Sequence, residues 1–288
     1  MLILIEKNKI IMRSFLPMMN YLYGKNYQTV QAIIESPFFD RLVDYLINHD
    51  SVILRELKKQ FADEHLFEKN LEKLIAAKII IRENRRYTFG GEILNEKSSL
   101  VDPQFSVDPT LLNRHLLMQL ANRLKAISAE DFYLVKTDQL AYFKTYQTPY
   151  FSWQILYKNP RQTNVATYFT ACATQNHLDA HQEMYTLIGD VDVIYYLDQI
   201  EVLIEKIKKG RRRIRGSIFV SSAEKFGLIQ AVDERLMIAK DVIVGEEETL
   251  ENFEAIFQLF DNYSAIEQRQ ILADLMQQLN VEQVQKIK

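Results

Sequence analysis

Residues 71–89 read LEKLIAAKIIIRENRRYTF, and the spacing of their apolar residues changes partway along the segment. Leu71, Leu74 and Ile75 recur at three- and four-residue steps, which is the spacing of one helix face. From residue 79 onward the chain is rich in β-branched and aromatic residues, with Glu83-Asn84 as the expected turn between two short strands. The segment therefore predicts a helix that leads directly into a β-hairpin.

Two further helices are predicted upstream of this segment. Ser36-Pro37 is a typical helix start, because serine can cap free N–H groups and proline costs nothing at the first helical position. The apolar residues that define the two helices are Phe38, Phe39, Leu42, Val43 and Leu46, then Leu54, Leu57 and Phe61. Three short helices followed by a hairpin are thus expected over about residues 30–92.

This order of elements resembles the winged helix-turn-helix family, and the passage from residue 71 to residue 87 carries the resemblance. The resemblance implies DNA binding, with the third helix in the major groove and the hairpin on the backbone or in the minor groove. By position, the residues implied to bind DNA are Lys69, Asn70, Lys73, Arg82, Arg85 and Arg86.

The net charge of this module does not favour DNA binding, although the three arginines of the hairpin form a local positive region. The exposed positions of the third helix hold two lysines and two glutamates, and residues 30–92 contain ten Lys or Arg against eleven Asp or Glu. Phosphate contacts dominate affinity for duplex DNA, so a neutral module binds it with a handicap. A second interpretation therefore stays open, in which the module docks protein, because fold alone does not give function.

A second basic cluster lies near residue 210. Residues 190–209 predict a long helix, followed by a strand at 217–220 and, from a capping box at Ser221, another helix. The residues implied to bind an anion are Lys208, Lys209, Arg211, Arg212, Arg213 and Arg215. The ligand would be a phosphate, a nucleotide, RNA or an acidic protein. The alternative is a solvated run that acids on neighbouring elements balance.

Three other features carry weaker functional hypotheses. Residues 131–158 are strongly aromatic, which indicates either a stacking platform for bases or, as we favour, one face of a sheet packed under helices. His177 and His181 could hold a metal with Asp179 or Glu183, although solvated histidines are the simpler interpretation. Cys172 is expected to be a buried small hydrophobe. No metal site, cofactor or catalytic residue is predicted.

Motifs of common enzyme classes are absent from the sequence. It has no phosphate-cradling glycine loop, no nucleophile elbow and no zinc-protease helix. An enzyme that acts on a phosphorylated substrate is therefore the weakest of the three functional hypotheses.

Composition and the chain ends indicate a compartment. The 288 residues are 48% apolar and 25% charged with a net charge of −3, and the single cysteine excludes an internal disulfide. No apolar run approaches the roughly 20 residues of a membrane span, so no membrane partner is predicted. Residues 1–5 are apolar but too short for a secretory signal, which favours the cytoplasm. Residues 1–17 are expected to be an upstream extension.

The whole chain resembles an uncharacterised family from low-GC Gram-positive bacteria that has no established activity. The resemblance rests on SPFF at 36–39, LRELK at 54–58, TPYFSW at 148–153 and GRRR at 210–213. The predicted fold is α+β and helix-rich, with an N-terminal extension at 1–29, a winged helix-like domain at 30–92, a linker at 93–109 and an α+β domain at 110–288 that ends in helices. The predicted function is a cytoplasmic, transcription-regulator-like DNA-binding protein whose C-terminal domain senses a ligand or forms a homodimer.

Overall fold

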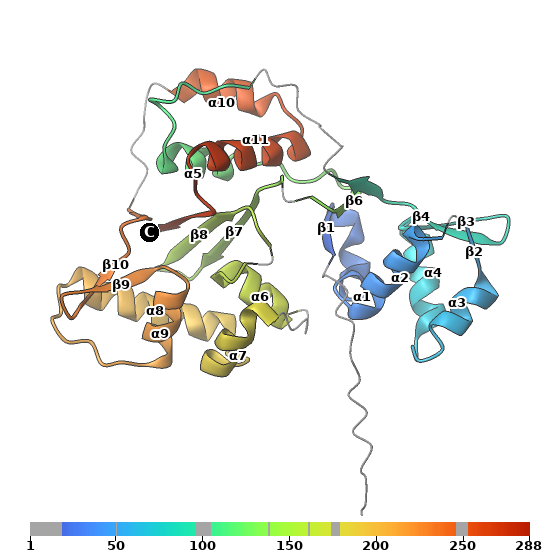
Figure 1. The fold of residues 1–288 in the computed structure, drawn as a ribbon, viewed down its shortest axis with the longest axis horizontal. Coiled ribbons are helices and arrows are strands. Elements are labelled where there is room, and N and C mark those ends of the chain that lie inside the picture. The colour runs from blue at the N-terminus through green and yellow to red at the C-terminus, as the bar shows by residue number, and fades with distance from the viewer. Residues whose placement is uncertain are drawn as a thin grey trace, which may run out of the picture.

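The computed structural model describes residues 19–49, 51–95, 105–137, 139–160, 162–173, 179–245 and 253–288. The proposed upstream extension at 1–17 and most of the central part of the predicted linker lie outside these residues. Helices and strands alternate irregularly along the described chain, so the fold is α+β, as the sequence predicts (Figure 1).

Residues 37–89 contain three helices and a hairpin in the predicted order. The elements are α2 (Pro37–Ile47), β2 (Val52–Ile53), α3 (Leu54–Gln60), α4 (Phe67–Ala76), β3 (Ile80–Glu83) and β4 (Arg86–Phe89), and the strands form a sheet in the order β2–β4–β3. Ser36 caps α2, with its hydroxyl oxygen accepting the N–H of Phe39 and Pro37 in the first turn.

The hairpin turn lies one residue later than expected. Glu83 still pairs with Arg86 across the strands, and the two central residues are Asn84 and Arg85 at φ 50° and 63°. Two left-handed residues form the type I′ turn, whose twist matches that of the flanking strands. Asparagine enters the left-handed region more readily than most residues, which explains why the turn is centred after Glu83.

Part of the predicted N-terminal extension is folded into the same core. Residues 20–34 form β1 (Asn20–Tyr23), η1 (Lys25–Val30) and α1 (Gln31–Ile34). β1 pairs antiparallel with β6 (Phe132–Val135), which pairs parallel with β5 (Glu92–Leu94). Tyr27 and Val30 are buried in one cluster with the side chains of α2. A single-sequence pattern could not show this, because the partner strand of β1 lies far along the chain.

The C-terminal half of the described chain contains a mixed four-stranded sheet. Its order is β11 (Val242–Val244), β12 (Gln283–Ile287), β8 (Ser152–Tyr157) and β7 (Tyr142–Gln147). β11 and β12 run parallel, and the other pairs are antiparallel. β12 follows the two predicted terminal helices and was not expected from the sequence.

Helices cover both faces of this sheet (Figure 1). One layer contains α5 (Arg114–Asn122), α10 (Glu254–Asp261) and α11 (Ala265–Gln278), and the other contains α6 (Val165–Ala173), α7 (Gln182–Ile188), α8 (Val193–Lys208) and α9 (Ile218–Lys225). Successive residues of β8 enter different cores: Trp153 and Ile155 pack with α6–α9, and Leu156 packs with α5 and α11. A short turn, η2 (Asp179–His181), precedes α7.

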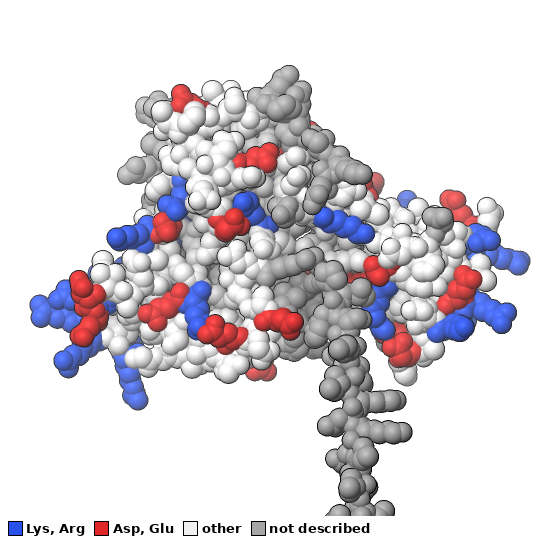
Figure 2. Space-filling model, viewed as in Figure 1, with Lys and Arg blue, Asp and Glu red and all other residues white. Residues whose placement is uncertain are grey.

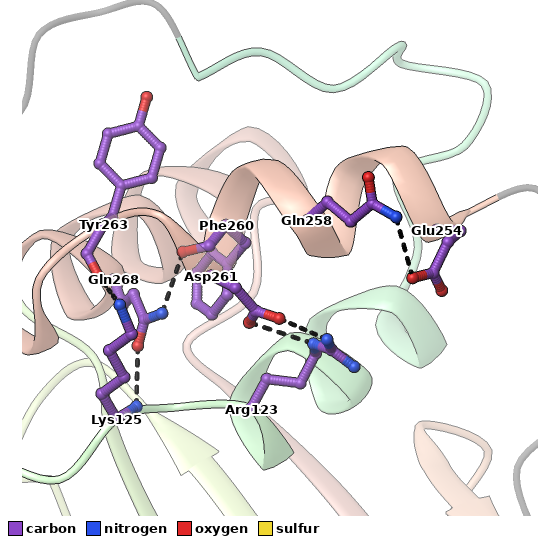
Figure 3. Close-up of polar contacts among 8 residues, drawn as sticks. All are labelled: Arg123, Lys125, Glu254, Gln258, Phe260, Asp261, Tyr263 and Gln268. Atoms are coloured by element: carbon purple, nitrogen blue, oxygen red, sulfur yellow. Dashed lines mark hydrogen bonds and ion pairs between the residues drawn. The ribbon is translucent and has the colours of Figure 1, made fainter.

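Polar contacts fasten α10 and α11 to α5 (Figure 3). Arg123 forms two hydrogen bonds with the carboxylate of Asp261, and its guanidinium lies 4.9 Å from the ring centre of Phe257. The buried side chain of Gln268 accepts the N–H of Lys125 at 2.8 Å and donates to the carbonyl of Phe260 at 2.9 Å. A capping box forms at the start of α11 between Ser264 and Glu267.

The segment after the basic cluster folds differently from the prediction. Residues 217–220 were expected to be a strand and Ser221 a helix cap, but α9 already begins at Ile218 and contains Ser221. Ser217 is the cap, because its hydroxyl oxygen accepts the N–H of Val220. Three consecutive β-favouring residues are overridden by this cap and by burial of Val220 and Ala223 on one helix face. A hairpin of β9 (Ile229–Val232) and β10 (Arg235–Ile238), also unpredicted, follows.

Candidate nucleic-acid interface

The outer face of α4 carries three of the residues implied to bind DNA. Phe67, Leu71 and Leu74 are buried in the core, and this orientation leaves Lys69 and Lys73 exposed. Asn70 is half-buried at the edge of the same face. Neither lysine takes part in an ion pair with any residue that the structure describes. The helix therefore presents two exposed lysines and one half-buried amide, and the lysines are unpaired as far as the described chain extends.

Two acids on this helix reduce its positive charge. Glu68 pairs with Lys58 of α3 at 2.9 Å, and Glu72 lies 3.9 Å from Arg82 of β3. All four side chains are largely exposed, so these pairs contribute little to stability. They do place acidic groups beside the predicted contact residues, which weakens attraction for phosphate.

The hairpin carries the three arginines on exposed positions. Arg82 lies 5.7 Å from the ring centre of Tyr87, and Arg86 donates from Nη1 to the hydroxyl of Ser51 at 3.0 Å. Arg85 is at the tip of the turn. The ion pair between Arg82 and Glu72 joins the hairpin to α4, so the structure brings the six predicted DNA-binding residues onto two adjacent elements.

The second basic cluster lies at the end of α8 and in the connection to α9. Lys208, Lys209, Arg211, Arg212, Arg213 and Arg215 are all exposed. Lys209 pairs with Glu205 at 2.8 Å, and this contact lowers the pKa of the Glu205 carboxyl. Within the described chain, the four arginines make no ion pair. The cluster is therefore solvated, and among the described residues no acid on a neighbouring element pairs with its arginines.

The two basic clusters lie at opposite ends of the molecule. The β3–β4 hairpin is at the right end in Figure 1, and the α8–α9 connection with the β9–β10 hairpin is at the left end. Figure 2 shows Lys and Arg gathered at both ends with acids beside them. One compact ligand cannot contact both clusters at once.

The aromatic stretch is core rather than a stacking platform. Trp153 is fully buried, and its indole N–H donates to Gln285 of β12 at 2.9 Å. Phe151 and Ile155 are buried in the same cluster. Tyr150, by contrast, is 86% exposed at the turn before β8. The favoured interpretation of β8 as a covered sheet face is therefore correct.

The histidine hypothesis has a different outcome. His177 lies outside the described residues, while His181 is fully buried beside Tyr168 and Tyr185. Its Nδ1 lies 3.0 Å from the Thr163 hydroxyl, and burial lowers the pKa of its imidazole. The expectation of a solvated histidine is thus wrong for His181. Among the residues with described positions, no three potential ligands cluster as a metal site would require.

A half-buried carboxyl at the junction of the two halves was not identified from the sequence. Asp40 of α2 accepts a hydrogen bond of 2.9 Å from the Tyr21 hydroxyl, and burial raises the pKa of Asp40 to about 6. Both residues line a cavity of about 220 Å³, which Tyr142 and Tyr157 border from the C-terminal sheet. The position of Asp40 between apolar helix residues was the available signal, but Tyr21 lay in the predicted extension.

Comparison with known proteins gives a family match for the first part of the chain only. A family described as a domain of unknown function (DUF1803) matches residues 20–127. This match begins at β1 and continues through α5, so it crosses both the predicted boundary at residue 30 and the predicted linker. No curated protein and no solved structure matches the chain. In the described part of the chain, no helix is both long and apolar enough to cross a bilayer.

Proposed function

We propose that the protein is a cytoplasmic DNA-binding protein of the transcription-regulator type, and that residues 30–92 are a winged-helix domain that contacts duplex DNA. The order helix, short strand, helix, helix and hairpin supports this proposal, as does the strand order β2–β4–β3. The C-terminal domain would sense a ligand or form a homodimer. The observation that carries the proposal is the uncovered face of α4 beside a hairpin with three exposed arginines.

In this proposal α4 enters the major groove and the hairpin contacts the backbone. Lys69, Asn70 and Lys73 face base edges, where asparagine can read adenine and lysine can read guanine. Arg85 and Arg86 contact phosphates, which fixes the position of the helix without reading sequence. Because Glu68 and Glu72 lie beside these residues, we expect weak and strongly salt-dependent binding.

The test is the salt dependence of duplex binding. The full chain is titrated into a fluorescently labelled duplex of about three helical turns between 50 and 200 mM salt, concentrations at which phosphate contacts are resolved. The double variant Arg85→Ala/Arg86→Ala should reduce the slope of log affinity against log salt by about 2, since each lost phosphate contact removes about 0.9.

The matched control is Lys25→Ala/Lys144→Ala, which removes two exposed cations outside both basic clusters. It should leave the slope unchanged, and circular dichroism should show that both variants are folded. The proposal fails if the wild-type chain retains no duplex at 50 mM salt, or if the hairpin variant keeps the wild-type slope.

A second candidate function is docking of the same module to a protein. Three large apolar residues of this module are exposed: Ile53, Leu66 and Ile81 at 38%, 49% and 39%. Exposed apolar residues near a charged face are typical of protein contacts. In that case Leu66→Ser would weaken the complex, while the hairpin variant Arg85→Ala/Arg86→Ala would change partner binding only through salt-dependent association rates.

A further inference from the structure

The passage from α9 into β9 repeats the passage from α4 into β3. Each helix ends in a residue with a left-handed backbone, Lys78 at φ 59° and Gly227 at φ 71°. The next amide then bonds back to the helix in the same way. The N–H of Ile79 donates to the carbonyl of Leu74 at 3.0 Å, and the N–H of Leu228 donates to that of Ala223 at 2.9 Å. Both ends are therefore the same helix cap.

The two hairpins that follow share one register. Ile80 pairs with Phe89 and Glu83 with Arg86 in the first hairpin, and Ile229 pairs with Ile238 and Val232 with Arg235 in the second. Each turn has two left-handed central residues, Asn84-Arg85 and Asp233-Glu234. Both hairpins are four residues per strand with a two-residue turn of type I′.

Each hairpin is also closed at its open end by the same bond. The N–H of Gly90 donates to the carbonyl of Ile79 at 2.8 Å, and the N–H of Ala239 donates to that of Leu228 at 3.0 Å. A long helix packs on the second strand in both cases, α2 on β4 and α8 on β10. Residues 37–89, the first unit, and residues 193–238, the second unit, thus have the same frame of two helices and a hairpin.

The two units differ in the connection between their helices. In the first unit, residues 48–66 contain β2 and α3. In the second unit, residues 209–217 replace them with a short connection that holds four arginines and no acid. The second unit contains nine Lys or Arg and six Asp or Glu, against ten and nine in the first. The more positive unit is therefore the one that the sequence did not identify.

The helix before the second hairpin is not free to enter a groove. α7 packs against α9, and Lys225 of α9 forms an ion pair with Glu183 of α7. The tip of the second hairpin is acidic, with Asp233 and Glu234 at its centre. The only strongly basic surface of the second unit that the structure describes is thus the end of α8 and its connection to α9. A surface of this kind fits repeated phosphates better than base edges.

We infer that residues 193–238 are a second winged-helix-like unit, which binds the phosphate backbone of duplex DNA through Lys208, Lys209, Arg211, Arg212, Arg213 and Arg215. Binding is independent of base sequence. This inference rests on the proposed function only in taking duplex DNA as the ligand. Because the two units lie at opposite ends of the molecule, one chain holds two separate DNA segments (Figures 1 and 2).

The first measurement compares salt slopes in the full chain. Because each unit binds its own duplex, the slope of the second unit is measured in the Arg85→Ala/Arg86→Ala background. In that background Arg211→Ala/Arg212→Ala/Arg213→Ala should lower the slope of duplex binding by about 3, and the control Lys25→Ala/Lys144→Ala should not change it. These arginines are exposed and make no ion pair with any residue of known position, so the variant should keep the wild-type circular dichroism spectrum. An unchanged slope overturns the inference, as does tight binding of polyglutamate that duplex DNA does not displace, which would assign the surface to an acidic protein.

The second measurement tests bridging. Two duplexes that carry a donor and an acceptor fluorophore are mixed with the protein at half-saturating concentration, and energy transfer reports that one particle holds both. Wild type should give transfer, whereas the 211–213 variant and the Arg85→Ala/Arg86→Ala variant should each bind one duplex without transfer. If the 211–213 variant still bridges, two first units of a homodimer hold the DNA and the inference is wrong.

The two proposals can fail separately. If the Arg85→Ala/Arg86→Ala slope equals that of wild type while the 211–213 variant loses its slope, the first unit does not bind DNA and the second unit does. If instead the Arg85→Ala/Arg86→Ala variant loses slope and the 211–213 variant keeps the wild-type slope, the first unit binds DNA and the second unit does not. Binding to duplexes of unrelated sequence should be equal within about twofold for the second unit, because backbone contacts carry no sequence information.

Discussion

The first and second units of this molecule share a backbone frame but expose different parts of it. In the first unit, α4 is uncovered and the arginines are on the hairpin. In the second unit, α7 covers α9, the hairpin tip is acidic and the arginines lie in the connection between the helices. The frame therefore does not determine which element meets a ligand; the placement of charge and of neighbouring helices does.

The equivalent residues in the two cores also differ in size. Leu74 and Ala223 accept the same cap hydrogen bond, and both are fully buried. The larger side chain fills the space between α4 and the first hairpin. In the second unit, α7 packs against α9, and the equivalent residue is a fully buried alanine. The same frame thus tolerates different packing because each unit has different neighbours.

The largest expected effect comes from this pair. Leu74→Ala should destabilise the first unit by about 3 kcal/mol, the usual cost of a cavity at a fully buried leucine. Ala223→Leu should destabilise the second unit by about 1–3 kcal/mol through overpacking. Trp153 is the only tryptophan and shares a core with Ala223, so its fluorescence follows the second unit, while circular dichroism follows both.

Urea unfolding by both probes distinguishes the outcomes. Leu74→Ala should shift the circular dichroism transition and leave the fluorescence midpoint nearly in place. Ala223→Leu should lower the fluorescence midpoint. If Leu74→Ala moves both probes equally, the two units unfold as one cooperative body and the comparison between them has no energetic meaning.

The second effect is a pH dependence of the first unit that comes from Asp40. Burial raises the pKa of Asp40 to about 6, above the value near 3.9 of an unfolded chain. The folded state therefore binds the proton more tightly, and this contribution to stability is present below about pH 4 and is lost as pH rises to about 6. The loss is about 3 kcal/mol for a shift of this size.

Asp40→Asn keeps a carbonyl oxygen for the Tyr21 hydroxyl and removes the charge. The variant should be more stable than wild type at pH 7, and the difference should vanish near pH 4. Asp44→Asn, one turn later on α2, is the matched control for loss of a carboxylate. In the second unit the buried polar group is Tyr196, whose hydroxyl contacts Ser222 and whose pKa is raised further by burial, so it stays neutral over this range. Equal stability of wild type and Asp40→Asn at pH 7 would contradict this account.

Local sequence signals located the first unit well because its information is contiguous. The cap at Ser36, the helical stripes and the β-rich run after Leu74 each lie within a few residues of one another. The same reasoning found α8 and the basic cluster at its end. The six DNA-binding candidates lie together for the same reason, since a helix and the strand that follows it are necessarily adjacent.

The features that the sequence did not predict depend on distant partners. β1 is a strand because β6 pairs with it, and β12 because β8 does. The second unit was not recognised for a different reason. Ser217-Ile218-Phe219-Val220 is β-favouring by composition, so the helix was expected to start too late, and the hairpin that follows it was not predicted. Only the backbone hydrogen bonds, and not residue identity, relate the second unit to the first.

The smallest effect separates stability from binding at the two hairpin turns. Arg85 and Glu234 are equivalent left-handed positions, where a side chain costs about 1 kcal/mol and glycine does not. Because glycine also makes the unfolded chain more flexible, Arg85→Gly and Glu234→Gly should each stabilise the protein by only about 0.5 kcal/mol. Arg85→Gly should nevertheless weaken DNA binding and lower its salt slope by about 1, whereas Glu234→Gly should strengthen binding, since it removes an acid from the second unit. Thermal unfolding measures the change in stability, and duplex titration measures the change in DNA binding. If both variants altered DNA binding in the same direction, the tips of the two hairpins would have the same role, and charge placement would not be what distinguishes the two units.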